Sequence, residues 1–96
     1  MITDEATTKI SDDGKILICI SKDQNVRWKR KGPSIYEWQR LSKKHASVDV
    51  ENGRFQYAGN ELHGKIVAVF TPWCGLDFNL TYLADSGELL SIDEAR

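Results

Sequence analysis

A β-hairpin is predicted by the stretch Thr8-Lys9-Ile10-Ser11-Asp12-Asp13-Gly14-Lys15-Ile16-Leu17-Ile18. Its centre, Ser11 to Gly14, suits a type I turn that ends in a left-handed glycine, which is the usual three-residue hairpin connection. A second turn of this kind, Ala84-Asp85-Ser86-Gly87, lies between Thr81 and Ser91 in similar surroundings. Both ends of the chain are therefore expected to form antiparallel strand pairs.

The tetrapeptide Glu51-Asn52-Gly53-Arg54 predicts a third hairpin. A type I′ turn needs positive φ at both central residues, and Asn-Gly adopts it at the least conformational cost. In that register Val50 faces Phe55 and Val48 faces Tyr57, so the apolar side chains share one side of the sheet. We therefore expect strands over 46–50 and 54–58.

One helix is predicted over residues 34–45. Ser34-Ile35-Tyr36-Glu37 is a capping box, in which Ser34 accepts from the amide of Glu37 and Glu37 accepts from the cap amide. At 100° per residue, Ile35, Trp38 and Leu41 share the inner face, with Tyr36, Arg40 and Lys43 opposite. The basic stripe is therefore expected to face solvent.

Further strands are expected over 7–11, 15–21, 65–70, 77–83 and 87–92, with a loop over 22–33. Ile66 to Phe70 is apolar at every position, which places that strand centrally in its sheet. Residues 1–96 are predicted to form a single α+β domain, with a mainly antiparallel sheet of about six to seven strands and one packed helix. The alternative is a small SH3-like or Sm-like barrel with a helix.

Positive charge is concentrated between Lys22 and His45, which hold eight of the thirteen Lys and Arg residues and two of the three Trp. This segment carries +6, whereas residues 1–21 carry −2 and residues 46–96 carry −5. Such a separation of charge bears on the choice of partner. A target with an anionic surface is expected.

Catalytic and metal-binding patterns are not found in the sequence. The potential ligands Cys19, His45, His63 and Cys74 lack the close spacing of metal-binding pairs. Phosphate-binding glycine loops and nucleophile motifs are missing as well. We therefore expect no metal, no cofactor and no enzymatic activity.

One short motif resembles the entrance of the thioredoxin active site, namely Phe70-Thr71-Pro72-Trp73-Cys74-Gly75. Asp77 stands where the second cysteine of that site is required. A dithiol exchange mechanism is excluded without this resolving thiol.

The first residues, Met1 to Thr8, are acidic and lack the apolar run of a signal peptide. The longest apolar runs, Ile16 to Ile20 and Ile66 to Phe70, fall far short of the roughly 20 residues that span a bilayer. A cytoplasmic protein without membrane contact is expected.

The segment from Arg27 to Lys31 combines cations with an aromatic ring, a composition typical of contact surfaces. We predict a non-catalytic module that docks on an acidic protein partner, such as an inhibitor, immunity or adaptor protein of bacterial or phage type. The alternative is binding of single-stranded RNA or DNA, in which cations pair with phosphates and rings stack on bases. The predicted contact residues are Arg27, Trp28, Lys29, Arg30, Lys31, Tyr36, Arg40, Lys43, Lys44 and Trp73.

Overall fold

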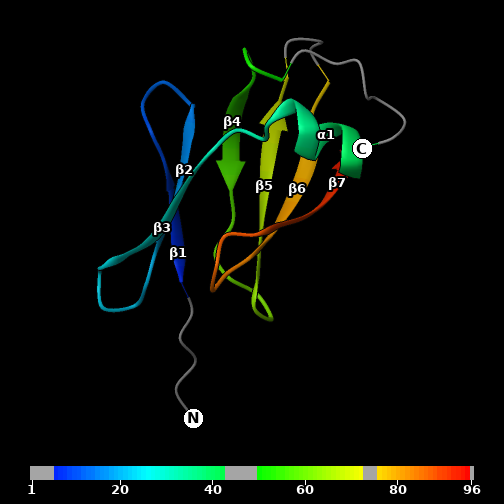
Figure 1. The fold of residues 1–96 in the computed structure, drawn as a ribbon. Helices are drawn as coiled ribbons and strands as arrows, with labels where there is room; N and C mark the ends of the chain where they lie inside the picture. The colour runs from blue at the N-terminus through cyan, green and yellow to red at the C-terminus, as the bar shows by residue number, and fades with distance from the viewer. Residues whose placement is uncertain (1–5, 43–49, 73–75, 96) are drawn as a thin grey trace.

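The strands form two antiparallel sheets, and one helix packs beside them (Figure 1). The computed structural model describes residues 6–42, 50–72 and 76–95. The expected α+β class is confirmed. The elements are β1 (Thr7–Ile10), β2 (Ile16–Ile20), β3 (Val26–Lys31), α1 (Ile35–Leu41), β4 (Arg54–Ala58), β5 (Lys65–Thr71), β6 (Phe78–Leu83) and β7 (Leu89–Glu94).

The first sheet has the order β1-β2-β3 and consists of two successive hairpins. The predicted turn at Ser11 is confirmed, because Gly14 has φ 73° and its amide donates to the Ser11 carbonyl at 2.9 Å. The expectation of a loop over 22–33 is wrong, since β3 occupies half of that segment. A compact turn after β2 makes this possible: Gln24 adopts φ 73°, and the Asp23 carboxylate accepts from the Asn25 amide.

The second sheet has the order β4-β5-β6-β7, so β5 is an inner strand as its apolar sequence predicted. The left-handed glycine before β7 is also confirmed, with Gly87 at φ 77°. Its amide donates to the Leu83 carbonyl at 2.8 Å and not to Ala84, so the turn is one residue longer than the predicted three-residue connection. Phe78, Leu80 and Tyr82 alternate inward along β6 and are buried.

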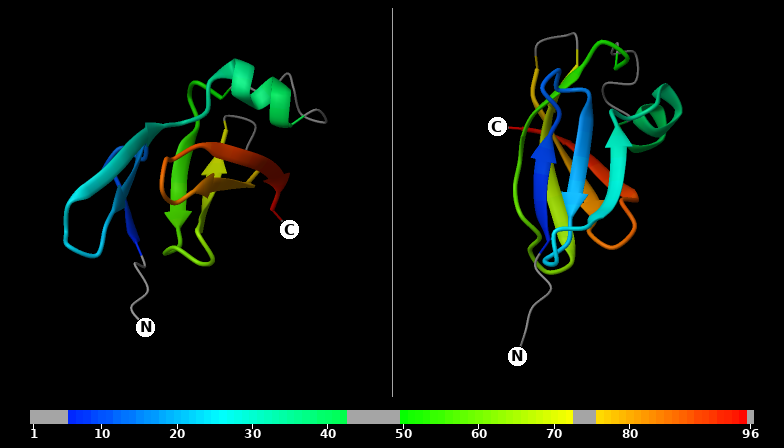
Figure 2. Two further views of the ribbon diagram at one scale, coloured as in Figure 1. Left: turned by 60° about the horizontal axis from the view of Figure 1, so that its bottom comes forward. Right: turned by 90° about the vertical axis from the view of Figure 1, so that its left-hand side faces the viewer.

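The two sheets meet where β1 lies beside β4. The Thr8 hydroxyl donates to the Gly59 carbonyl at 3.0 Å, and the Phe55 amide donates to the Gly14 carbonyl at 2.7 Å. The opposite edges, β3 and β7, are not paired with each other among the described residues. The alternative of a closed barrel is therefore wrong. Helix α1 lies against β7 on this open side (Figure 2).

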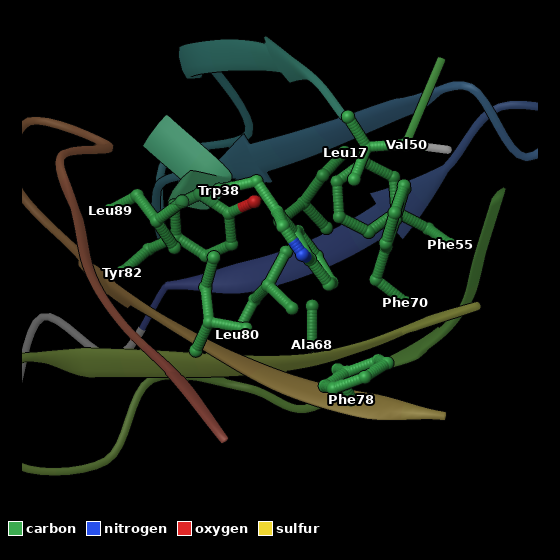
Figure 3. Close-up of a cluster of buried hydrophobic side chains, with 11 residues drawn as sticks. Leu17, Trp38, Val50, Phe55, Ala68, Phe70, Phe78, Leu80, Tyr82 and Leu89 are labelled. Carbon is green, nitrogen blue, oxygen red and sulfur yellow. The ribbon is translucent and has the colours of Figure 1, made fainter. Parts of the chain in front are cut away.

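The core lies between the sheets and is completed by Trp38 from α1 (Figure 3). The Trp38 ring meets Phe78 edge-on at 4.9 Å and Phe70 at 6.1 Å between centroids, and it is fully buried. Trp38 is therefore the largest side chain by which the helix packs on the open side. Ile35 and Leu41 pack against the same cluster, as predicted for the inner face.

The helix is shorter than expected. Its capping box is confirmed, with the Glu37 amide donating to Ser34 Oγ at 3.1 Å and the Ser34 amide donating to Glu37 Oε1 at 3.1 Å. At the other end Ser42 leaves the helical conformation, with φ −120° and ψ 73°, and is buried. The helix therefore stops at Leu41, and residues 43–45 lie outside the described part of the chain.

The prediction of a type I′ hairpin at Asn52-Gly53 is wrong. Neither residue has positive φ, and the Gly53 amide closes a β-turn with the Val50 carbonyl at 3.1 Å. Val50 belongs to no strand, residues 46–49 lie outside the described range, and β4 pairs with β5. Glycine is required at Gly53 for contact reasons, since a Cβ there would lie 2.4 Å from the Phe70 ring.

Candidate functional site

A β-bulge in β3 divides the predicted contact residues between two faces. Cys19 pairs with Trp28 and Ile20 pairs with Val26, so Arg27 is an extra residue without a partner in β2. Simple alternation would place Arg27 on the same face as Lys29 and Lys31. Because the bulge adds one residue, it reverses that alternation. Arg27 and Trp28 both contact the second sheet, and the two lysines remain outside.

Arg27 joins three parts of the fold. Its guanidinium lies 3.5 Å from carboxylate oxygens of Glu61 and Asp85, and it donates to the Ala84 carbonyl at 3.3 Å. Its side chain is only 20% exposed, and Glu61 also accepts from the Ala6 amide at 3.2 Å. Arg27 therefore serves the fold and is not a solvated contact residue.

Trp28 packs on the turn between β6 and β7. Its ring lies 5.9 Å from the Tyr82 ring, and a Cβ at Gly87 would approach it within 2.7 Å. Its indole N–H donates to the Ala84 carbonyl at 2.7 Å. The ring is half-buried with its donor engaged, so it does not offer a free stacking platform.

Arg30 turns inward toward α1. Its guanidinium lies 2.8 Å from Glu37 Oε2, while the other oxygen of Glu37 completes the helix cap. Both side chains are about one-third exposed, at 33% and 28%. The pair therefore ties the start of the helix to β3.

Lys29 and Lys31 are exposed on the outer face of the first sheet. There Ile16, Ile18 and Ile20 project from β2, opposite to the buried Leu17 and Cys19. The register places Lys9 and Lys29 on either side of Ile18, and Lys31 opposite Ile16. We call this surface the isoleucine–lysine face, and it consists of Lys9, Ile16, Ile18, Ile20, Lys29 and Lys31.

No described segment lies in front of this face in the right-hand view of Figure 2. Sequence reasoning found only its two β3 lysines. The other residues of the face follow from the alternation of side chains between the two faces of β1 and β2. This alternation becomes informative only once β2 is known to lie between β1 and β3.

Acidic residues lie at the turns that bound the face and are engaged in local hydrogen bonds. Asp13 Oδ1 accepts from Ser11 Oγ at 2.7 Å and from the Lys15 amide at 3.0 Å, and these bonds lower the pKa of Asp13. Hydrogen bonds from Ser21 and from the Asn25 amide likewise lower the pKa of Asp23. Between these turns, the paired positions that face outward carry lysine, isoleucine, threonine and valine, but no carboxylate.

The remaining predicted residues fall elsewhere. Tyr36 and Arg40 are exposed on the outer side of α1, as expected, and Tyr36 is 80% exposed. Lys43, Lys44 and Trp73 lie outside the described residues. The predicted loop-helix surface is therefore not one patch of aligned cations, because Arg27, Trp28 and Arg30 are turned into the fold.

The outer face of the second sheet offers a contrasting surface. Tyr57 and Val67 are 66% and 45% exposed, and Asn79 and Thr81 lie on the neighbouring strand. This surface is partly apolar, and Lys65 lies on it at the start of β5. Unlike the isoleucine–lysine face, it has no apolar residue with a lysine paired on both sides among the described residues. It provides matched positions for control substitutions.

In the described ranges no group of three His, Cys, Asp or Glu side chains is placed to hold a metal ion. The helix in this part of the chain is not long and apolar enough to cross a membrane. Comparisons with protein-family models, curated proteins and solved structures found no match.

Proposed function

We propose that the protein is a non-catalytic binding module that docks on an acidic protein through the isoleucine–lysine face. The observation that carries this proposal is the cross-strand row Lys9, Ile18 and Lys29, with Ile16 and Lys31 beside it. An apolar centre with a charged rim is the usual anatomy of a protein interface.

Within the described ranges, the side chains of Lys9, Lys29 and Lys31 form no ion pair that would assign them a role in folding. Neighbouring strands are spaced by about 4.8 Å, so the row brings two ammonium groups to the two sides of one isoleucine. The two lysines are two strand spacings apart, about 10 Å, so salt screens most of the repulsion between them. An acidic partner would offset the remainder of this repulsion, and its field would also speed the encounter.

Single-stranded nucleic acid receives less support than a protein. Its recognition relies on aromatic rings that stack on bases, together with cations that pair with phosphates. The ring predicted for that role, Trp28, packs on Tyr82 and donates its N–H to Ala84. Arg27 and Arg30 are likewise engaged with carboxylates of the protein itself.

Affinity capture with matched variants tests the proposal. The binding variant combines Lys9→Glu, Lys29→Glu and Lys31→Glu, and the control combines Lys65→Glu with Tyr57→Ala on the second sheet. We expect the native and control proteins to retain a nuclease-resistant acidic protein that the binding variant loses. Recovery of nucleic acid that disappears after nuclease treatment, or full retention by the binding variant, would contradict the proposal.

A further inference from the structure

A cleft of about 360 Å³ lies at one end of the isoleucine–lysine face. It is formed where the start of β2 and the end of β3 meet the linker to α1 and the turn before β4. Its apolar lining includes Ile16, Pro33 and Val50, and the described cations of the lining are Lys15 and Lys31. We call it the Pro33 cleft.

The apolar side of the cleft is firmly placed by the core. Pro33 is buried and Val50 is only 3% exposed. Gly53, which also lines the cleft, lies so close to Phe70 that a Cβ would meet the ring at 2.4 Å. The cleft therefore belongs to the packed fold, and a ligand would find its apolar surface already formed.

The cationic groups surround this apolar surface unevenly. Lys15 Nζ donates to the Gly53 carbonyl at 3.3 Å, which holds this ammonium group beside the cleft. Lys31 is exposed on the facing strand, and Glu51 is the one carboxylate among the lining residues that the structure describes. The described part of the lining thus combines two lysines with one acid and favours an anionic ligand.

The cleft is continuous with the isoleucine–lysine face. Ile16 and Lys31 face each other across β2 and β3, and both also line the cleft. A segment lying along β2 would therefore pass from the face directly into the cleft. The volume falls in the range of natural ligand pockets and suffices for one large apolar side chain.

We infer that the Pro33 cleft receives the apolar anchor of the acidic partner: a single aromatic or leucine side chain flanked by Asp or Glu. This inference rests on the proposed function and deepens it. The anchor fills the surface formed by Ile16, Pro33 and Val50, while its acidic neighbours meet Lys15 and Lys31. Buried anchors of this kind dominate the binding energy of many interfaces.

Two defined peptides test the inference with the native protein. One has the sequence Ac-Glu-Asp-Glu-Trp-Glu-Asp-Glu-NH₂, and the other replaces Trp by Ala. Amide chemical shifts of the labelled protein are followed during titration. We expect the Trp peptide to bind at least about tenfold tighter and to shift the amides of Gly32, Ser34 and Gly53. The Ala peptide should shift mainly the amides of Lys29 and Lys31.

Variants then separate the cleft from the face. Lys15→Ala should weaken the Trp peptide more than the Ala peptide, whereas Lys65→Ala should change neither. Equal affinity for the two peptides, with amide shifts confined to Lys9, Lys29 and Lys31, would overturn the inference about the cleft. The proposed function would then still stand. Failure of both peptides to bind would overturn both. Shifts of the cleft amides by an oligothymidylate alone would also overturn the inference, because the ligand would then be a nucleic acid.

Discussion

The indole N–H of Trp28, in β3, donates a 2.7 Å hydrogen bond to the carbonyl of Ala84, at the start of the β6–β7 turn. This bond joins the edge strand of the first sheet to the second sheet, across 56 residues of sequence. Gly87 completes the contact, because only a residue without Cβ leaves room for the ring. Trp28 is therefore one of the side chains that hold the open side of the fold together.

Replacing Trp28 by Ala should destabilise the fold. The change removes the ring contact with Tyr82 and the bond to Ala84, so we expect a loss of about 2 to 4 kcal/mol in the free energy of unfolding. Trp28→Phe should lose about 1 kcal/mol from the missing donor. Urea denaturation measures both, with the exposed Tyr36→Ala as control. A Trp28→Ala midpoint equal to that of the control would show that the ring does not hold the sheets.

Arg27 and Lys29 should differ in their effect on stability although they are close in sequence. Arg27→Ala leaves Glu61, whose side chain is 19% exposed, without its cation, and we expect a loss of about 1 to 3 kcal/mol. Lys29→Ala, on the exposed face, should stay within about 0.5 kcal/mol of the native protein. Thermal or urea unfolding of the two variants makes the comparison. Equal midpoints would speak against the inward placement of Arg27.

The cap of α1 should contribute measurably to folding. Ser34→Ala removes the acceptor for the Glu37 amide, and we expect a loss of about 0.5 to 2 kcal/mol. Gln39→Ala, at an exposed helix position, is the control and should have little effect. An unchanged denaturation midpoint and slope for Ser34→Ala would mean that the cap is not formed in solution.

Gly53 should not tolerate a side chain, for reasons of contact. Gly53→Ala places a Cβ against the Phe70 ring and 2.9 Å from Pro72 Cα, and we expect a loss above about 1 kcal/mol. Gly59→Ala is the matched control, because its Cβ would lie 3.9 Å from the nearest atom, the Val67 carbonyl oxygen. The control should be neutral or slightly stabilising. Similar losses for the two variants would refute the contact argument.

The first hairpin should weaken in acid. Because hydrogen bonds from Ser11 and the Lys15 amide lower the pKa of Asp13 below its ordinary 3.8, the folded state favours the carboxylate. Its contribution is therefore present above the ordinary pKa and is lost as pH falls through the lowered value. Asp13→Asn should remove part of the stability change between about pH 7 and about pH 2, and Asp12→Asn serves as control. An Asp13 carboxyl that titrates at or above 3.8 by NMR would contradict this expectation.

Features that depend on neighbours in sequence were predicted well. The turns ending in Gly14 and Gly87 and the capping box of Ser34 and Glu37 are closed by hydrogen bonds within a few residues. The bounds of strand 54–58 also agree with β4, although this strand pairs with β5 and not with the expected strand 46–50. Such features follow from backbone preferences and short-range bonds, which the local sequence carries in full.

The candidate site depended on distant contacts. Within residues 22–33, the turn before β3 contains no glycine to mark it as a hairpin turn. Local preferences therefore did not predict the strand that follows this turn and pairs with β2. The bulge at Arg27 and the contact of Trp28 with Ala84 then turned both residues inward, toward groups far along the chain. The sequence alone determined the turns at Gly14 and Gly87, the helix start and the segregation of charge. Only the tertiary structure decided which cations remain exposed, because packing against the second sheet selects the face to which each side chain of β3 points.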